Sequence, residues 1–225
     1  MHVARVVVGP LRTNCYVLHD AAAGTALVVD PGDDAAAVLA ALGRLGSPPV
    51  AAIVLTHCHW DHVQAVDAMR DACGAPVAAR AEEHCVWAHE LDHLRGHGHW
   101  DWALAADERP ASNDPITPGW DGTIDVALDQ HHDQFGLDVV HTPGHSPGSI
   151  SLVARADRFV LTGDTLFPGG PGLTGWPLSD FPAIIDSVAR LFALPDETVV
   201  LPGHGPSTTI GRERPCLEEW RARGW

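Results

Sequence analysis

The stretch Thr56-His57-Cys58-His59-Trp60-Asp61-His62 decides the fold, because it packs four potential metal ligands into six residues. It follows Val50–Leu55, a nearly continuous apolar run of the kind found in a strand buried on both faces. Active-site groups in α/β folds usually lie where such strands end and loops begin. We therefore expect a metal centre at this strand end.

The order of residues within this stretch would allow one short loop to serve two metal ions at different heights. In an extended segment alternate side chains point the same way, so His57 and His59 share one side. Asp61 and His62 follow at the start of the next predicted helix, so they lie at a different height. A helix N-cap would explain Asp61, but it leaves the three neighbouring histidines without a role.

Three further polar residues follow later predicted strands, each in a glycine-rich turn. They are His145 in Thr142-Pro143-Gly144-His145-Ser146-Pro147-Gly148, Asp164 in Gly163-Asp164-Thr165, and His204 in Gly203-His204-Gly205-Pro206. Taken singly each is weak, because such residues are often only turn formers or exposed side chains. Together with the first stretch they complete a far more specific set of seven candidate ligands, namely His57, His59, Asp61, His62, His145, Asp164 and His204.

Outward from these motifs, short β-rich runs alternate with helical stretches. The predicted strands are Val3–Val8, Cys15–His19, Ala26–Asp30, Val50–Leu55, Pro76–Ala79, Thr123–Leu128, Leu137–His141, Ser149–Ala154, Arg158–Thr162 and Thr198–Leu201. The predicted helices are Asp33–Leu45, Val63–Cys73, Glu82–Arg95, Phe181–Leu191 and Arg212–Arg223, and Gly96–Gly122 is a predicted long loop. This rhythm predicts an α/β fold of two mixed sheets between helices. We expect one domain over residues 1–225, built from two similar halves, about 1–115 and 116–225.

The motifs resemble those of the metallo-β-lactamase superfamily. The matching runs are T-H-C-H-W-D-H at 56–62, T-P-G-H-S-P-G at 142–148, G-D-T-L-F at 163–167 and P-G-H-G-P at 202–206. They are most similar to its glyoxalase II-like branch (hydroxyacylglutathione hydrolase and relatives), which Asn14-Cys15-Tyr16 and Val29-Asp30-Pro31-Gly32 also match. The resemblance spans the chain from Asn14 to Pro206. It implies a four-layer αββα sandwich with the metal site at the sheet edges.

The resemblance also implies a role for each of the seven residues. His57, His59 and His145 would hold one metal ion, and Asp61, His62 and His204 would hold the other. Asp164 would bridge the two ions, so Asp61 and Asp164 are the expected catalytic carboxylates. Sites of histidine and carboxylate suit zinc, although iron or manganese also fits them. We expect two Zn²⁺ ions per chain.

Two such ions would make a hydrolase that needs no serine or cysteine nucleophile. A solvent molecule bridging two cations is deprotonated near neutral pH and supplies a hydroxide nucleophile. One cation would polarise the substrate carbonyl, and the other would stabilise a departing thiolate or alkoxide. We therefore expect cleavage of a small thioester or related ester. Cys58 lies between two ligands, and we expect its side chain to point away from them and pack in the core.

Two variable segments, Gly96–Gly122 and Pro168–Asp180, are expected to border the centre. Both are rich in Gly, Pro and Trp, and Arg109 is the only arginine in either, which favours an apolar or neutral acyl group. The chain ends one predicted helix after His204, so we expect no counterpart of the helical extension with which glyoxalase II holds glutathione. Nearby tryptophans could line a substrate wall or serve ordinary packing, and the sequence leaves both open. They are Trp87, Trp100, Trp102, Trp120 and Trp176.

A second histidine motif points to a different enzyme class. The run from His89 to His99 satisfies H-E-x-x-H-x-x-G-x-x-H, the metzincin protease pattern, with Glu90 as general base. Metzincins need a methionine turn downstream, whereas the only methionines, Met1 and Met69, lie upstream. A solvated helix end near the site is the favoured interpretation.

Within the superfamily, the main alternative is a persulfide dioxygenase with one iron held by two histidines and an aspartate. The complete second ligand set, which includes His204, argues for two metals instead. A lactonase or a β-lactamase is less favoured, since β-lactamases are usually exported. A structural zinc module is disfavoured because such sites are usually closed and rich in cysteine.

Composition limits the partners. The formal charge of −15, from 29 acidic and 14 basic residues, repels phosphate backbones and anionic lipids. We expect a small-molecule substrate and neither nucleic acid nor a membrane, while the oligomeric state stays open. Five scattered cysteines indicate reduced thiols. With no signal-peptide pattern and no long apolar run, the sequence predicts a cytoplasmic protein.

Overall fold

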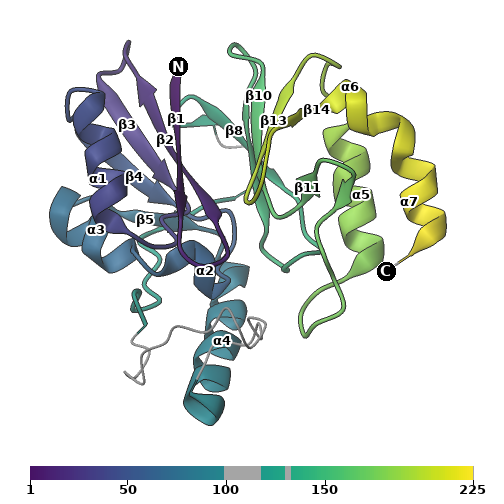
Figure 1. Ribbon diagram of the computed structural model, residues 1–225, viewed down its shortest axis with the longest axis horizontal. Helices are drawn as coiled ribbons and strands as arrows, with labels where there is room; N and C mark the ends of the chain where they lie inside the picture. The colour runs from purple at the N-terminus through teal and green to yellow at the C-terminus, as the bar shows by residue number, and fades with distance from the viewer. Residues whose placement is uncertain (99–117, 130–132, 225) are drawn as a thin grey trace.

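The protein is built in four layers (Figure 1). A computed structural model describes residues 1–98, 118–129 and 133–224. Two mixed β-sheets lie face to face between helices. The first sheet is covered by α1 (Ala35–Arg44) and α3 (Val66–Cys73), and the second by α5 (Phe181–Leu191) and α7 (Leu217–Arg223). This arrangement confirms the predicted αββα sandwich.

The first sheet has the strand order β1-β2-β3-β4-β5-β6. Neighbouring strands from β1 to β3 are antiparallel, and those from β3 to β6 are parallel. The strands are β1 (His2–Val8), β2 (Thr13–Asp20), β3 (Thr25–Val29), β4 (Val50–Val54), β5 (Val77–Ala79) and β6 (Val126–Ala127). Sequence reasoning placed β6 in the second half of the chain, but it extends the first sheet.

The second sheet has the order β14-β13-β10-β9-β8-β7, in which only the β10–β13 pair is parallel. A further pair, β11 (Leu166–Phe167) and β12 (Gly170–Pro171), forms a small separate sheet. The strands of the second sheet are β7 (Asp133–Gln134), β8 (Leu137–His141), β9 (Ile150–Ala154), β10 (Phe159–Gly163), β13 (Val199–Pro202) and β14 (Thr208–Thr209). The strands β7, β11, β12 and β14 are only two residues long and were not predicted.

Alternating side chains on the central strands fill two different cores. On β3, Val28 packs toward the helices of the first sheet, whereas Leu27 and Val29 pack between the sheets. On β10, Leu161 packs between the sheets, and Val160 packs with the helices of the second sheet. Because both faces are covered, these strands read as continuous apolar runs. Because apolar side chains fill both faces of these strands, the polar side chains lie beyond the strand ends.

Two predicted helices are interrupted. The predicted helix Val63–Cys73 is instead α2 (Trp60–Val63) followed by α3, because the Ala65 amide donates to the Pro31 carbonyl at 2.9 Å. The predicted helix Arg212–Arg223 is divided into α6 (Ile210–Glu213), the 3₁₀ turn η2 (Arg214–Cys216) and α7. Pro215 lies in that turn, and a proline ring excludes a helix from continuing through it.

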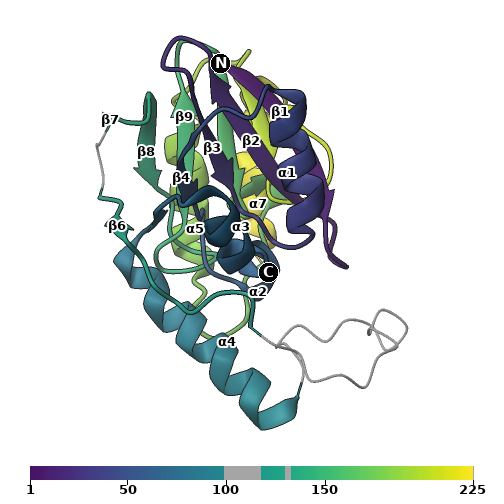
Figure 2. The ribbon, with the colours of Figure 1, turned by 90° about the vertical axis from the view of Figure 1, so that its left-hand side faces the viewer.

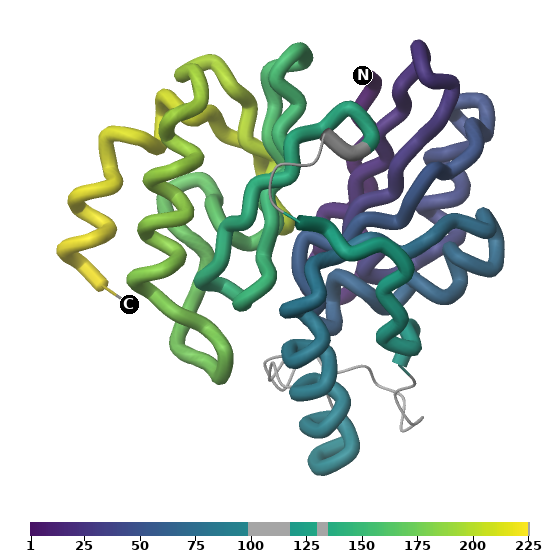
Figure 3. The backbone as a smooth tube through the Cα atoms, turned by 180° about the vertical axis from the view of Figure 1, so that it is seen from behind, coloured from purple at the N-terminus to yellow at the C-terminus, as the bar shows by residue number. Residues whose placement is uncertain are grey.

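Helix α4 (His84–His97) follows the 3₁₀ turn η1 (Ala81–Glu83) and projects from one end of the sandwich (Figures 1 and 2). The predicted loop Gly96–Gly122 therefore begins inside the last turn of α4, and much of it lies outside the described residues. Seen from behind, residues 118–129 run along the side of the first sheet before the chain continues into the second sheet (Figure 3).

Two further features concern helix length and the cysteines. In the parts of the chain that the structure describes, no helix combines the length and apolar character that crossing a membrane requires. All five cysteines lie in those parts and are free thiols, with Cys15 and Cys58 buried. The predicted packing of Cys58 in the core is therefore confirmed.

Candidate metal centre

The first ligand stretch is fixed to the end of the neighbouring strand. The buried carboxylate of Asp30, just after β3, accepts hydrogen bonds from the Thr56 amide and hydroxyl, both at 2.7 Å. Gly32 lies against the backbone of Asp61, where an added Cβ would be 1.8 Å from the carbonyl oxygen. The ends of β3 and β4 therefore hold this loop in one conformation.

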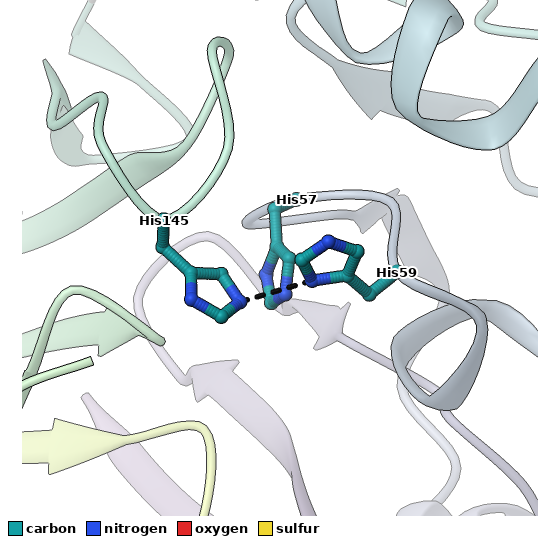
Figure 4. Close-up of side chains that lie close together, drawn as sticks. All are labelled: His57, His59 and His145. Carbon is teal, nitrogen blue, oxygen red and sulfur yellow. Dashed lines mark hydrogen bonds between the residues drawn. The ribbon is translucent and has the colours of Figure 1, made fainter. Parts of the chain in front are cut away.

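The first triad joins two segments that are distant in sequence. His57 and His59 follow β4, and His145 comes from the turn between β8 and β9 (Figure 4). The three ring centroids lie 4.7–4.8 Å apart, and His59 Nδ1 is 2.9 Å from His145 Nε2. All three side chains are buried, and one nitrogen from each lies within 4.8 Å of the others.

The second triad lies beside the first. His204 Nε2 is 3.2 Å from Asp61 Oδ2 and 3.3 Å from His62 Nε2. The hydroxyl of Thr13, on β2, donates to the same Asp61 oxygen at 2.8 Å. One potential ligand atom each from Asp61, His62 and His204 lies within 4.8 Å of the others. Because Asp61 lies in the first turn of α2 and accepts from Thr13, it is not an N-cap.

Asp164 reaches both triads from the turn between β10 and β11. Its Oδ2 lies 3.6 Å from His145 Nε2 in the first triad and 3.4 Å from His204 Nε2 in the second. Its Oδ1 lies 3.6 Å from His62 Nε2. The structure thus brings all seven predicted residues to one place, with Asp164 between the two groups.

Outer contacts orient the histidine rings. Nδ1 of His145 is 2.9 Å from the Leu173 carbonyl, and Nδ1 of His204 is 3.0 Å from the Leu11 carbonyl. Nδ1 of His62 lies 3.1 Å from Asp30 Oδ2. A carbonyl or carboxylate at Nδ1 leaves the Nε2 lone pair directed to the centre, as in histidines that bind metals.

The first triad is electrostatically suited to bind a cation. Burial lowers the pKa of His57, His59 and His145, and neighbouring histidines add to this effect while Asp164 opposes it. Neutral imidazole is the form that coordinates a metal. The lowered pKa values of these three rings favour the form that binds metal.

The second triad carries compensating charges. Burial lowers the pKa of His62 and His204, but Asp61 and Asp164 outweigh it and raise the values to about 9 and about 11. Burial likewise raises the pKa of Asp61, but the two histidines bring it down to about 2. Neighbouring histidines, above all His204 and His62, also hold the pKa of Asp164 well below its ordinary value, although burial raises it. A cation binding here would displace the protons of His62 and His204, and the two ionised carboxylates would then face it.

The donor set fits divalent metal ions. His57 Nε2 and Asp164 Oδ1 are buried without a hydrogen-bond partner among the described residues, although buried polar atoms normally have one. Both belong to a cluster with His62 whose ligand atoms also lie within 4.8 Å of one another. Histidine nitrogens and carboxylate oxygens are ligands that zinc, iron and manganese accept.

One side of the centre is apolar. The Trp176 ring packs edge-on against His145 at 4.9 Å and His59 at 5.9 Å, and its Nε1 donates to the His145 carbonyl. Nearby in the same segment, Leu173 and Leu178 are 52% and 46% exposed. Of the other tryptophans considered, Trp87 and Trp120 pack in the core, and Trp100 and Trp102 lie outside the described residues.

Sequence reasoning missed the residues that support the ligands. Asp30, Thr13 and Glu83 are buried and hydrogen-bonded to the ligand loops, but none lies in a recognisable ligand spacing. Asp30 belongs to a matched run, yet an aspartate before Pro-Gly reads as an ordinary turn former. Their roles depend on contacts between segments far apart in the chain.

The second histidine motif lies on α4. Its last residue, His99, is outside the described residues, while His93 and His97 stack on one another with centroids 4.2 Å apart. Within the described ranges, all clusters of three or more potential ligands belong to the strand-end centre. The protease interpretation therefore gains no support.

Replacing Glu90 with glutamine is accordingly expected to leave hydrolysis within about threefold of wild type, a change below roughly 1 kcal/mol in transition-state binding. Glu90 is buried, so thermal unfolding should be recorded alongside initial rates. Loss of activity in a folded, fully metal-loaded Glu90→Gln protein would revive the protease interpretation.

Comparisons with known proteins agree with this geometry. Residues 8–204 match the metallo-beta-lactamase superfamily. The chain is 34% identical to a "Probable metallo-hydrolase" of Streptococcus pyogenes, covering 88% of this chain and 81% of that protein. It is 27% identical to hydroxyacylglutathione hydrolase GloC of Haemophilus influenzae, covering 95% of each.

Solved structures share the whole architecture. BLEG-1, a B3 metallo-beta-lactamase, has a TM-score of 0.79 and 33% identity, covering 95% of this chain and 97% of that one. TTHA1623, solved in a di-iron-bound form, has a TM-score of 0.75 and 34% identity, covering 94% and 97%. ETHE1 from Myxococcus xanthus has a TM-score of 0.70 and 25% identity, covering 95% and 82%. With the family match over most of its length, the chain belongs to the metallo-β-lactamase superfamily.

Proposed function

We propose that this metallo-hydrolase is a dinuclear zinc enzyme that cleaves small thioesters. The observation that carries the proposal is the pair of ligand triads with Asp164 between them. When bound, two divalent cations supply a Lewis acid for the substrate carbonyl and lower the pKa of a water molecule. The similarity to hydroxyacylglutathione hydrolase GloC supports a thioester substrate.

The chain's own residues would hold the two ions separately. His57, His59 and His145 would bind one ion through neutral nitrogens. Asp61, His62 and His204 would bind the other, with Asp164 in reach of both.

The leaving group favours a thioester over an ester or an amide. The pKa of Asp61 is about 2 and that of Asp164 is well below its ordinary value, so neither carboxyl carries a proton to donate at neutral pH. An alkoxide or an amide ion departs less readily than a thiolate when no proton is supplied, even where a cation stabilises it. A thiol has a pKa of about 8.5, so it can depart as the thiolate.

The segment beside the first triad would receive the acyl group. Trp176 packs edge-on against two ligand rings, and Leu173 and Leu178 of the same segment expose apolar side chains. The main chain of this segment is fixed, because Leu173 accepts from His145 and the Ser179 hydroxyl accepts from the amides of Gly175 and Trp176. Such a wall selects an apolar or neutral acyl group.

The test compares kcat/KM for a glutathione thioester with that for a short neutral thiol ester of the same acyl group. We expect hydrolysis of both, with a ratio below about tenfold, because the segment 168–180 carries no basic side chain to bind the carboxylates of glutathione. A glutathione preference of several hundredfold, roughly 3–4 kcal/mol of transition-state binding, would contradict this proposal.

Replacing Leu173 with serine removes an apolar side chain from the segment beside the first triad. Leu173→Ser should raise KM for thioesters with long apolar acyl chains and leave KM for the acetyl thioester unchanged.

Further assays separate the remaining candidates. Elemental analysis should return two zinc ions per chain, and the di-iron form of TTHA1623 makes iron the alternative metal to measure. If the protein instead contains a single iron and consumes oxygen when a persulfide is added, the dioxygenase assignment would take the place of the hydrolase assignment. The similarity to BLEG-1 makes a β-lactam the second candidate substrate, so a chromogenic cephalosporin belongs in the panel. Free cysteines and the acidic charge support a cytoplasmic enzyme acting on a small molecule.

A further inference from the structure

Glu83 is a fully buried carboxylate outside the seven-residue centre. It is the last residue of η1, immediately before α4, and its side chain accepts three short hydrogen bonds. Oε2 accepts from the Cys58 amide at 2.7 Å. Oε1 accepts from the Ser146 hydroxyl at 2.6 Å and from the Gly148 amide at 2.7 Å.

These three donors lie in the two loops that carry the first triad. Cys58 lies between His57 and His59, and Ser146 directly follows His145. One carboxylate therefore ties together two loops whose ligand rings are only 4.7–4.8 Å apart. Among the described residues these hydrogen bonds reach Cys58, Ser146 and Gly148, which are not members of the second triad.

Local packing keeps Glu83 in this position. An added Cβ on Gly148 would lie 2.8 Å from both Cγ and Oε1 of Glu83, so the carboxylate is in close contact with that turn. Ser149 supports the same turn, since its hydroxyl is 2.6 Å from the Ser146 hydroxyl and accepts from the Ser146 amide. The acceptor is thus held by the fold on the side of the loops that faces away from solvent.

We propose that Glu83 is a positioning residue for one of the two metal ions, the ion held by His57, His59 and His145. This inference rests on the proposed dinuclear centre. Metal affinity depends on ligands held at a fixed separation, and loss of a supporting hydrogen bond typically costs about 10–100-fold in affinity. Because Glu83 fixes the separation of the two loops, it controls the affinity of the first site and leaves the second unchanged.

Glutamine is the informative substitution because it keeps the shape and changes only the hydrogen bonding. A carboxylate accepts at both oxygens, whereas one end of the amide carries hydrogens. The amide of Glu83→Gln must therefore face at least one of the three backbone and hydroxyl donors with a donor of its own. The substitution therefore removes a hydrogen bond that connects the two loops, and it creates no cavity.

The experiment is a competition titration of the full-length, zinc-loaded protein with a chromophoric chelator. Wild type should release two ions. In Glu83→Gln one ion should bind at least tenfold more weakly, and the other should keep its wild-type affinity. Glu82→Gln is the matched control, since Glu82 is exposed and paired with Arg80, and it should keep both ions.

A second variant keeps the test decisive if Glu83→Gln folds poorly. Ser146→Ala removes one of the three donors and should weaken the same ion to a smaller extent. Adding Ser146→Ala to His59→Ala should cause no further loss, because the ion that it affects is already lost.

Three outcomes overturn the inference in distinguishable ways. Unchanged affinity for both ions in Glu83→Gln and Ser146→Ala would remove Glu83 from the metal centre but leave the proposed function intact. Equal weakening of both ions would show a general structural role, again leaving the proposed function intact. A wild-type chain that binds fewer than two ions would overturn the dinuclear proposal and the selective role of Glu83 with it.

Discussion

Replacing Asp164 with alanine is expected to lower thioester hydrolysis by at least about a thousandfold, on the order of 4 kcal/mol in transition-state stabilisation. Among the residues that the structure describes, Asp164 alone has a carboxylate within 3.6 Å of histidines in both triads. Its loss removes a carboxylate within reach of both triads, so both cations should bind more weakly. Metal content and initial rates should be measured on the same preparation.

The matched control is Asp186→Ala, which removes an exposed aspartate from α5. It should retain full activity and both metal ions. An Asp164→Ala protein that holds two ions and hydrolyses thioesters within about tenfold of wild type would show that the centre does not depend on a shared carboxylate.

Adding a single methyl group at Gly203 is expected to be nearly as damaging. A Cβ there would lie 2.1 Å from Asp164 Oδ1 and 2.9 Å from His62 Cε1. The backbone cannot retreat easily, because the Gly203 carbonyl accepts from Asn14 and its amide donates to Gly163. Asp164 must move instead, and a displacement of about 1 Å in a catalytic site can cost about 100-fold in rate.

Circular dichroism should show that Gly203→Ala retains the fold, while metal content and kcat fall together. Gly43→Ala is the control, because Gly43 lies in α1 with nothing within 4 Å of its added Cβ. Alanine there should stabilise the helix by up to about 1 kcal/mol and leave activity unchanged. Wild-type metal content and rate in Gly203→Ala would mean that Asp164 tolerates displacement.

The site could be predicted from sequence because its ligands come in compact motifs at strand ends. Val50–Val54 is recognisable as a buried strand, and the stretch that follows it has no other explanation for three histidines and an aspartate. The central strands were predicted for the same physical reason, since two-sided burial leaves a continuous apolar signal. A strand or a ligand motif could be predicted wherever a single segment of sequence contains the complete pattern.

Predictions failed where structure depends on a partner segment. The two-residue strand β6 is defined only by pairing with β5, so its sequence gave no sign of which sheet it joins. Glu83 resembles any acidic residue before a helix, and its role emerges only when Cys58 and Ser146 come together around it. The break at Pro215 was visible in the sequence, and the steric effect of its ring should have divided the predicted helix.

Because the ligands come from both sheets, occupancy of the centre bears on the lifetime of the protein as well as on its chemistry. An ion that binds only the folded chain adds about 4 kcal/mol at a free concentration a thousandfold above its dissociation constant. That is a large share of the roughly 5–15 kcal/mol by which a typical protein is stable. We therefore expect the metal-free chain to unfold and to be proteolysed more readily than the metal-bound chain, so that metal supply would affect its abundance in addition to its turnover.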